Sequence, residues 1–235
     1  MRRWELLFST ALSGWEHMGK DFRLFQDFEQ GQIGPTLRIY SWKPKCISLG
    51  YAQKMDKLVD RSLARRLGWD VVKRPTGGGI VFHNEAEVTY SLVMDKDDPI
   101  LPKGLVPAYC KISEAVVKAL EILGVMGIIS KKKAEHGTRE GGLCFSYPAE
   151  YEVVVDGKKV VGSAQKRGRR ALLQQGSIFV SPTPENALAI LKKRPDALNA
   201  ISLQEVTGRT LLFDELASAL AKGFQAVLEA RFNAV

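Results

Sequence analysis

The sequence has few cysteines and no long apolar segment. Only three cysteines occur in 235 residues, and no two of them form a CxxC pair. This spacing argues against a zinc knuckle or a disulfide framework, and it favours a reducing, cytoplasmic compartment. No run of about eighteen apolar residues is present, so we expect no membrane-spanning helix. Glu5 interrupts the apolar residues near the start, which predicts a first strand there instead of a secretion signal.

Motifs for several common ligands are also missing. The chain contains neither GxxxxGK[ST] nor GxGxxG, and its aromatic residues do not interleave with its basic runs. We therefore expect no nucleic-acid partner, and no cluster of residues predicts a metal site. The net charge is nonetheless +8, concentrated at 131–133, 158–161, 166–170 and 192–194. These clusters are either solvated surface residues or a face that binds an acidic protein.

Hydrophobic periodicity predicts an α+β (mixed α/β) fold with a mostly antiparallel mixed sheet flanked by helices. Strands are expected at 35–42, 46–53, 87–94 and 171–180, and helices at 55–69, 106–125, 183–193 and 213–232. The segment 151–165 reads as a hairpin, because Asp156 and Gly157 accept the positive φ angles of a tight turn. Strands and helices do not alternate strictly, which argues against a Rossmann sheet. We expect one domain over residues 1–235, and a monomer.

A triglycine loop lies in the segment "KRPTGGGIVFH", residues 73–83. Glycines have no side chains to keep a ligand away from the backbone, so their N–H groups can bind a phosphate, a carbonyl oxygen or an acyl thioester. Arg74 is close enough in sequence to add a charged donor, and we expect His83 to line a pocket. A flexible turn without any ligand is the alternative interpretation of three consecutive glycines.

A cysteine and a lysine flank the start of the predicted hairpin. Cys144 precedes it within "GGLCFSYP", and Lys159 follows fifteen residues later on the return strand. Free cysteine is most often a small buried apolar residue, but a neighbouring ammonium favours the thiolate and makes it a nucleophile. The glycine-rich setting of Cys144 favours the nucleophile. Cys46 and Cys110 are expected to be structural.

Two segments resemble the signatures of a known superfamily. "RPTGGGIVFHNEAEVTYSLV" is similar to the signature loop of the lipoate–biotin ligase and octanoyltransferase superfamily, and "DGKKVVGSAQKR" is similar to its lysine-bearing motif. The order of the segments also agrees over residues 3–181, leaving 182–235 as a C-terminal helical segment. The "CF" before the hairpin resembles the cysteine-dependent octanoyltransferases of lipoate biosynthesis in Gram-positive bacteria.

This resemblance implies a function and a site. Octanoyltransferases of this kind carry octanoate as a thioester on the cysteine and need no cofactor. The donor is octanoyl-acyl carrier protein, and the acceptor is a lysine of a lipoyl domain, such as the glycine cleavage H protein. The matching catalytic residues are Cys144 and Lys159. The matching substrate-binding residues are Arg74, Thr76, Gly77, Gly78, Gly79, His83, Gly162, Ser163, Ala164, Gly176 and Ser177.

Some features leave other activities open. Gln175 precedes Gly176 where the superfamily usually has a histidine, and the segment 13–26 matches the usual early helix poorly. The alternatives are a lipoate ligase that uses ATP and Mg²⁺, an amidotransferase between lipoyl domains, and a catalytically inactive module that binds acyl carrier protein.

Overall fold

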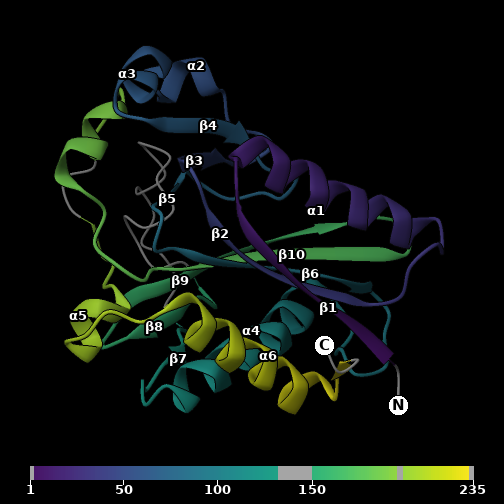
Figure 1. Ribbon diagram of the computed structural model, residues 1–235. Helices are drawn as coiled ribbons and strands as arrows, with labels where there is room; N and C mark the ends of the chain where they lie inside the picture. Colours follow the sequence, from purple (N-terminus) through teal and green to yellow (C-terminus); the bar gives the residue numbers. More distant parts are fainter. Residues whose placement is uncertain (1–2, 132–149, 195–197, 233–235) are drawn as a thin grey trace.

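The computed structural model describes residues 3–131, 150–194 and 198–232, and its backbone forms two sheets (Figure 1). The larger sheet has the strand order β11-β1-β2-β6-β10-β9-β8-β7. Strand β1 is parallel to β2 and β11, and all other neighbours are antiparallel. This confirms the expected mostly antiparallel mixed sheet. Its strands are β1 (Arg3–Leu12), β2 (Thr36–Trp42), β6 (Val88–Asp95), β7 (Ile128–Ile129), β8 (Val153–Val155), β9 (Lys158–Arg167), β10 (Ala171–Ile178) and β11 (Arg231–Phe232).

The smaller sheet has three strands in the order β4-β3-β5. Strand β3 (Lys45–Leu49) lies in the middle, parallel to β4 (Trp69–Lys73) and antiparallel to β5 (Val81–His83). The triglycine loop connects β4 to β5, so it lies at one end of this sheet. Strand β3 follows β2 directly, which places the small sheet beside the large one.

Helices cover the large sheet on both faces (Figure 1). Helices α4 (Leu105–Ile122) and α6 (Phe213–Leu228) pack on one face, while α1 (Gly14–Glu29) lies on the other. Successive side chains of β2 point to opposite faces of the sheet, so the strand contacts both helical layers. Leu37 and Ile39 belong to the core under α4 and α6, whereas Arg38 and Tyr40 point toward α1.

The segment 55–69 differs from the single helix that its periodicity predicts. It forms two short helices, α2 (Met55–Leu58) and α3 (Arg61–Arg66). Val59 between them is extended and bridges to Leu191, and Asp60 accepts a hydrogen bond from the N–H of Leu63 as the cap of α3. A capping aspartate at the centre of an amphipathic pattern ends one helix and starts the next.

The C-terminal part also differs in detail from the prediction. The expected helix at 183–193 is a short 3₁₀ helix, η1 (Glu185–Ile190), followed by α5 (Leu203–Thr207). Helix α6 ends at Leu228 because Glu229 is left-handed, and β11 then pairs with β1. The hairpin turn is as expected, with φ of 50° at Asp156 and 75° at Gly157. Among the described residues, no helix is long and apolar enough to span a membrane.

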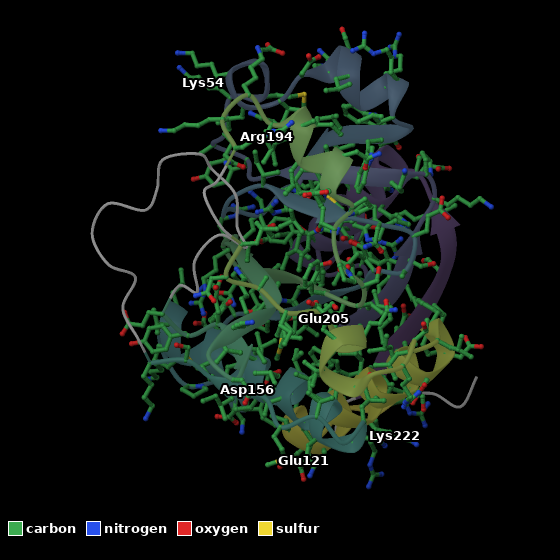
Figure 2. The ribbon with its side chains drawn as sticks, turned by 90° about the vertical axis from the view of Figure 1, so that its left-hand side faces the viewer. Lys54, Glu121, Asp156, Arg194, Glu205 and Lys222 are labelled. Carbon is green, nitrogen blue, oxygen red and sulfur yellow. The ribbon has the colours of Figure 1, made fainter. Side chains whose placement is uncertain are left out.

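Helices α4 and α6 approach each other closely at Gly223. A Cβ atom there would lie 2.2 Å from the carbonyl oxygen of Ala115 and 2.9 Å from the nitrogen of Ala119. Both are backbone atoms, so the helices would have to move apart to make room. The outer side of this layer is charged, and Figure 2 shows Glu121 and Lys222 projecting from it.

We predict that Gly223→Ala destabilises the fold although alanine is the better helix former. Overpacking of this kind costs about 1–3 kcal/mol, whereas the gain in helix propensity is about 1 kcal/mol. Gly19→Ala on α1 is the matched control, since nothing lies within 4 Å of a Cβ at that position, and it should stabilise. Urea unfolding of the two variants measures both effects. Equal stabilisation by both substitutions would contradict the close helix contact.

Candidate active site

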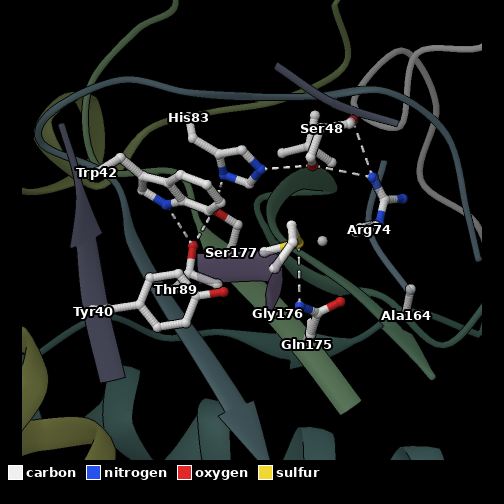
Figure 3. A pocket seen from close by; sticks show the side chains of 13 residues that line it. Tyr40, Trp42, Ser48, Arg74, His83, Thr89, Ala164, Gln175, Gly176 and Ser177 are labelled. Carbon is white, nitrogen blue, oxygen red and sulfur yellow. Dashed lines mark hydrogen bonds between the residues drawn. The ribbon is translucent and has the colours of Figure 1, made fainter. Parts of the chain in front are cut away.

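A small pocket of about 30 Å³ lies between the two sheets and beneath α1 (Figure 3). Its wall combines apolar side chains with several hydroxyl, amide and imidazole groups. The lining residues are Met18, Tyr40, Trp42, Ser48, Arg74, Val81, His83, Thr89, Gly162, Ala164, Gln175, Gly176 and Ser177.

Strands β9 and β10 supply one wall of the pocket. Four of the predicted substrate-binding residues, Gly162, Ala164, Gly176 and Ser177, line it. Ser163 is different, because its hydroxyl lies on the opposite face of β9, 3.0 Å from the hydroxyl of Tyr90. A Cβ at Gly176 would lie 2.2 Å from the Tyr90 ring and 2.6 Å from the Ser163 hydroxyl, so only glycine fits there.

Arg74 fixes the triglycine loop through the loop's own carbonyl groups. Its Nη2 donates to the carbonyls of Gly77 at 2.6 Å and Gly79 at 2.7 Å, and its Nη1 donates to the carbonyl of Ser48 at 3.1 Å. Gly78 between them has a φ of 88°, which favours glycine. The loop is therefore held in place and is not a loose turn. Arg74 lines the pocket, but the N–H groups of its guanidinium donate mainly to carbonyl groups of the protein itself.

His83 lines the pocket as predicted, and it is held as a neutral imidazole. Its Nε2 lies 2.7 Å from the Ser48 hydroxyl and its Nδ1 lies 3.2 Å from the Ser177 hydroxyl. The ring stacks on Trp42 with centroids 4.0 Å apart. Burial, followed by the nearby charge of Arg74, lowers the pKa of His83 well below 6.5. An uncharged ring suits a pocket for an apolar ligand.

The Ser177 hydroxyl connects this histidine to a buried carboxyl group. Glu87 is fully buried, with its Oε2 3.3 Å from the Ser177 hydroxyl and its Oε1 accepting from the N–H of Val180. Burial raises the pKa of Glu87 well above 4.5, against the hydrogen bonds that lower it. Nothing in the sequence distinguishes Glu87, because one glutamate within a strand-like segment carries no signal of burial.

Gln175 connects the triglycine loop to a buried ion pair. Its Oε1 accepts from the Thr76 hydroxyl at 2.8 Å, and its Nε2 donates to Oδ2 of Asp21 at 2.6 Å. The same carboxylate accepts from the Tyr40 hydroxyl at 2.9 Å and forms an ion pair with Arg38 at 2.6 Å. Thr76 therefore contributes by holding Gln175, and the glutamine seen as a departure from the superfamily is a structural part of the site.

The ammonium group of Lys159 is completely buried and forms an ion pair with Glu152. A buried lysine without a carboxylate tends to lose its proton, so Glu152 favours the charged form. The sequence analysis did not identify Glu152. Cys144, the predicted partner of Lys159, lies outside the described residues.

The two cysteines that the structure describes are poor nucleophiles. Cys46 is fully buried in a cluster with Tyr40 and Trp42, and burial followed by the charge of Asp70 raises its pKa well above 9.0. Cys110 is partly buried on α4, where burial and Glu114 raise its pKa. Both cysteines therefore remain thiols, which agrees with the structural role expected for them.

Three apolar residues on the strands around the pocket have different positions. Val81 lines the pocket. Leu49 and Val160 instead belong to the hydrophobic cores beneath the small and the large sheet, respectively. Met18 and Trp42 complete the apolar lining, and the sequence analysis did not identify either of them.

His17 is locked in one tautomer behind the pocket. Arg38 Nη2 only donates, so the Nδ1 atom of His17, 2.5 Å away, accepts its hydrogen bond. The Nε2 atom then donates to the carbonyl of Ser41 at 2.8 Å. A proton on Nδ1 would point at the guanidinium group. Burial and this cation together lower the pKa of His17 from 6.5 to about 4.

We predict that His17 makes the fold less stable in acid. Between pH 6.5 and about 4 the unfolded chain binds a proton at His17 and the folded chain does not, so stability falls as the pH falls through this window. The lowered pKa of His17 corresponds to a change of at most about 3 kcal/mol in the free energy of unfolding. His17→Asn should show a shallower fall when unfolding is measured by denaturant titration at pH 7 and pH 4.5. Identical pH dependence in both proteins would refute this role.

Comparison with known proteins agrees with this geometry. Residues 13–225 match the family model of the lipoyl protein ligase A/B catalytic domain. The chain is 36% identical to octanoyltransferase LipM of Kyrpidia tusciae, covering 99% of this chain and 90% of the relative. It is 34% identical to octanoyltransferase LipM of Clostridioides difficile, covering 95% of this chain and 86% of the relative.

Solved structures show the same fold at lower sequence identity. A lipoate-protein ligase A bound with ATP superposes with a TM-score of 0.80 and 23% identity, covering 100% of this chain and 89% of that chain. A T. acidophilum protein with bound lipoic acid superposes with a TM-score of 0.78 and 23% identity, covering 99% and 88%. The chain therefore belongs to the family of the lipoyl protein ligase A/B catalytic domain, in which it is similar to octanoyltransferases along nearly its whole length.

Proposed function

We propose that this chain takes an octanoyl group from octanoyl-acyl carrier protein onto Cys144 and passes it to a lysine of a lipoyl domain. The family places the chain among the acyltransferases of lipoate biosynthesis, with an acyl donor and a lipoyl-domain acceptor. The glycine cleavage H protein or a dehydrogenase subunit is the proposed acceptor. The observation that best supports the proposal is the buried ion pair of Lys159 with Glu152, because it lies at the position where the resemblance requires an activating lysine.

The proposed reaction has two acyl-transfer steps. In the first, the Cys144 thiolate attacks the thioester carbonyl of the donor, the new C–S bond forms, and the donor thiolate leaves and takes up a proton. In the second, the lysine amine of the acceptor attacks the enzyme thioester, loses a proton, and expels the Cys144 thiolate. Exchange between two thioesters is nearly balanced in energy and formation of an amide is favourable. The proposed reaction therefore uses neither ATP nor Mg²⁺.

In this proposal, the positive charge of Lys159 explains why the sulfur of Cys144 is reactive. A free cysteine titrates near 8.5, so little thiolate exists at pH 7. A neighbouring ammonium stabilises the thiolate and lowers the pKa of the thiol. Glu152 has a separate role in this proposal, because it keeps the buried lysine protonated and able to donate a hydrogen bond.

The lining of the pocket suits the tail of a medium-length acyl chain. Met18, Trp42, Val81 and Ala164 offer apolar contacts, and neutral His83 adds no charge. Burying about six methylene groups at roughly 0.8 kcal/mol each contributes about 5 kcal/mol. We assign the tetrahedral oxyanion to backbone N–H groups of the triglycine loop or of residues 162–164. The loop qualifies because Arg74 fixes its orientation.

The most direct test is the intact mass of the protein. After incubation with octanoyl-acyl carrier protein and without ATP, we expect a gain of one octanoyl group that Cys144→Ala abolishes. Cys110→Ser is the matched control and should acquire the group normally, because that thiol is not the proposed nucleophile.

Other outcomes identify the alternatives. A mass gain only with free octanoate and ATP would indicate a ligase. A mass gain only from an octanoylated lipoyl domain would indicate an amidotransferase. Binding of acyl carrier protein without any mass gain would indicate an inactive binding module.

A further inference from the structure

A second and larger cavity opens beside α3, away from the pocket. It has a volume of about 650 Å³ and shares no lining residue with the pocket. We call it the α3 groove. Its residues come from the start of α1, the β2–β3 turn, α3 and the strand β4, which is an edge strand of the small sheet. The lining residues are Trp15, Pro44, Arg61, Ser62, Arg65, Arg66, Gly68, Trp69, Asp70 and Val71.

The α3 groove is strongly basic. Arg61, Arg65 and Arg66 are all exposed, and none of the three forms an ion pair with a carboxylate among the residues that the structure describes. Lys45 adds a fourth positive charge above the ring of Trp69 at 5.1 Å. The carboxylate of Asp70 lies in the groove too, where it accepts from the N–H of Gly14 at 3.1 Å. Positive charge therefore dominates this surface, and it attracts an acidic partner.

An exposed tryptophan adds an apolar contact beside these arginines. Trp15 is 64% exposed on the first turn of α1. Tryptophan and arginine are the residues most enriched where protein interfaces gain their binding energy. A groove that combines both has the composition of a protein-binding surface.

The basic cluster at 166–170 is less available to a partner than the α3 groove. Arg167 donates to the carbonyl of Gly104 at 3.0 Å and to Gln165 at 2.7 Å. Arg170 stacks over Phe28 and lies 3.6 Å from the carboxylate of Asp95. These guanidinium groups already have partners within the chain, and an acidic protein would have to compete with them.

We propose that the α3 groove is the docking surface for the acidic carrier protein that delivers the octanoyl group. This inference rests on the proposed function. Trp15 and Met18 lie three residues apart on α1, about 4.5 Å along its axis, and Met18 lines the acyl pocket. The groove is thus close to the pocket but separate from it.

This separation favours the donor over the acceptor. A carrier protein holds its acyl group at the end of a long, flexible pantetheine arm, so it can dock beside the pocket and still deliver the thioester. An acceptor offers an amine at the end of a single lysine side chain. Its protein surface must therefore lie at the mouth of the pocket itself.

The test compares two donors in the first half-reaction. The rate of acyl-enzyme formation is measured for Arg61→Glu/Arg65→Glu/Arg66→Glu, with either octanoyl-acyl carrier protein or octanoyl-pantetheine as donor. We expect KM for the carrier protein to rise at least tenfold, with kcat and the octanoyl-pantetheine reaction little changed. Trp15→Ala should give a smaller change in the same direction, and the wild-type KM should rise with salt concentration.

The matched control reverses three lysines on the opposite helical layer. Lys111→Glu/Lys118→Glu/Lys222→Glu makes the same change in net charge on α4 and α6, and Figure 2 shows Lys222 far from Lys54 at the α2 end. We expect this variant to retain most of the wild-type KM. An equal rise in both variants would mean that only total charge matters, and would overturn the proposal.

Three further results would also overturn it. An unchanged KM in the groove variant would exclude docking there. Equal loss with octanoyl-pantetheine would show that the substitutions damage the enzyme itself. Normal acyl-enzyme formation with slow transfer to a lipoyl domain would assign the groove to the acceptor. Failure of the proposed function is recognised separately, because the wild-type protein would then form no acyl-enzyme with either donor.

Discussion

The pocket depends on the buried carboxylate of Asp21. It binds the guanidinium of Arg38, the hydroxyl of Tyr40 and the amide of Gln175, so one side chain on α1 fixes strands β2 and β10. Gln175 in turn holds Thr76, at the base of the triglycine loop. A buried charge is stable only when such partners satisfy it, and removing one partner leaves the others without compensation. The site is therefore rigid on the side where the acyl tail is proposed to bind.

The buried charge of Lys159 also depends on a partner of opposite sign. Lys159 is a buried cation whose charge is preserved by Glu152. The two buried ion pairs have different roles. Asp21 accepts hydrogen bonds from several side chains, whereas Lys159 is itself the proposed donor to the sulfur of Cys144. His83 is neutral and adds no charge to the pocket that it lines.

The sequence was informative where local rules decide the outcome. The Asp156-Gly157 turn, the long helices α4 and α6, and the lining by Gly162, Ala164 and His83 all followed from turn chemistry, periodicity or the resemblance.

The sequence was misleading at Asp60, since hydrophobic periodicity does not reveal a capping residue that ends one helix and starts the next. Glu87, Glu152 and Asp21 were missed because their importance comes from burial and distant partners, which a single sequence does not reveal. Ser163 was included because it matches the superfamily motif, but strand alternation turns its hydroxyl away from the pocket.

The central claim is that the ammonium of Lys159 holds the thiol of Cys144 ionised near neutral pH. It is tested most directly by alkylation of Cys144 at a series of pH values, followed by peptide mapping, in the wild-type protein and in Lys159→Met. We expect a midpoint well below 8.5 in the wild-type protein, and a midpoint at or above that value in the variant. The same midpoint in both proteins would contradict the account.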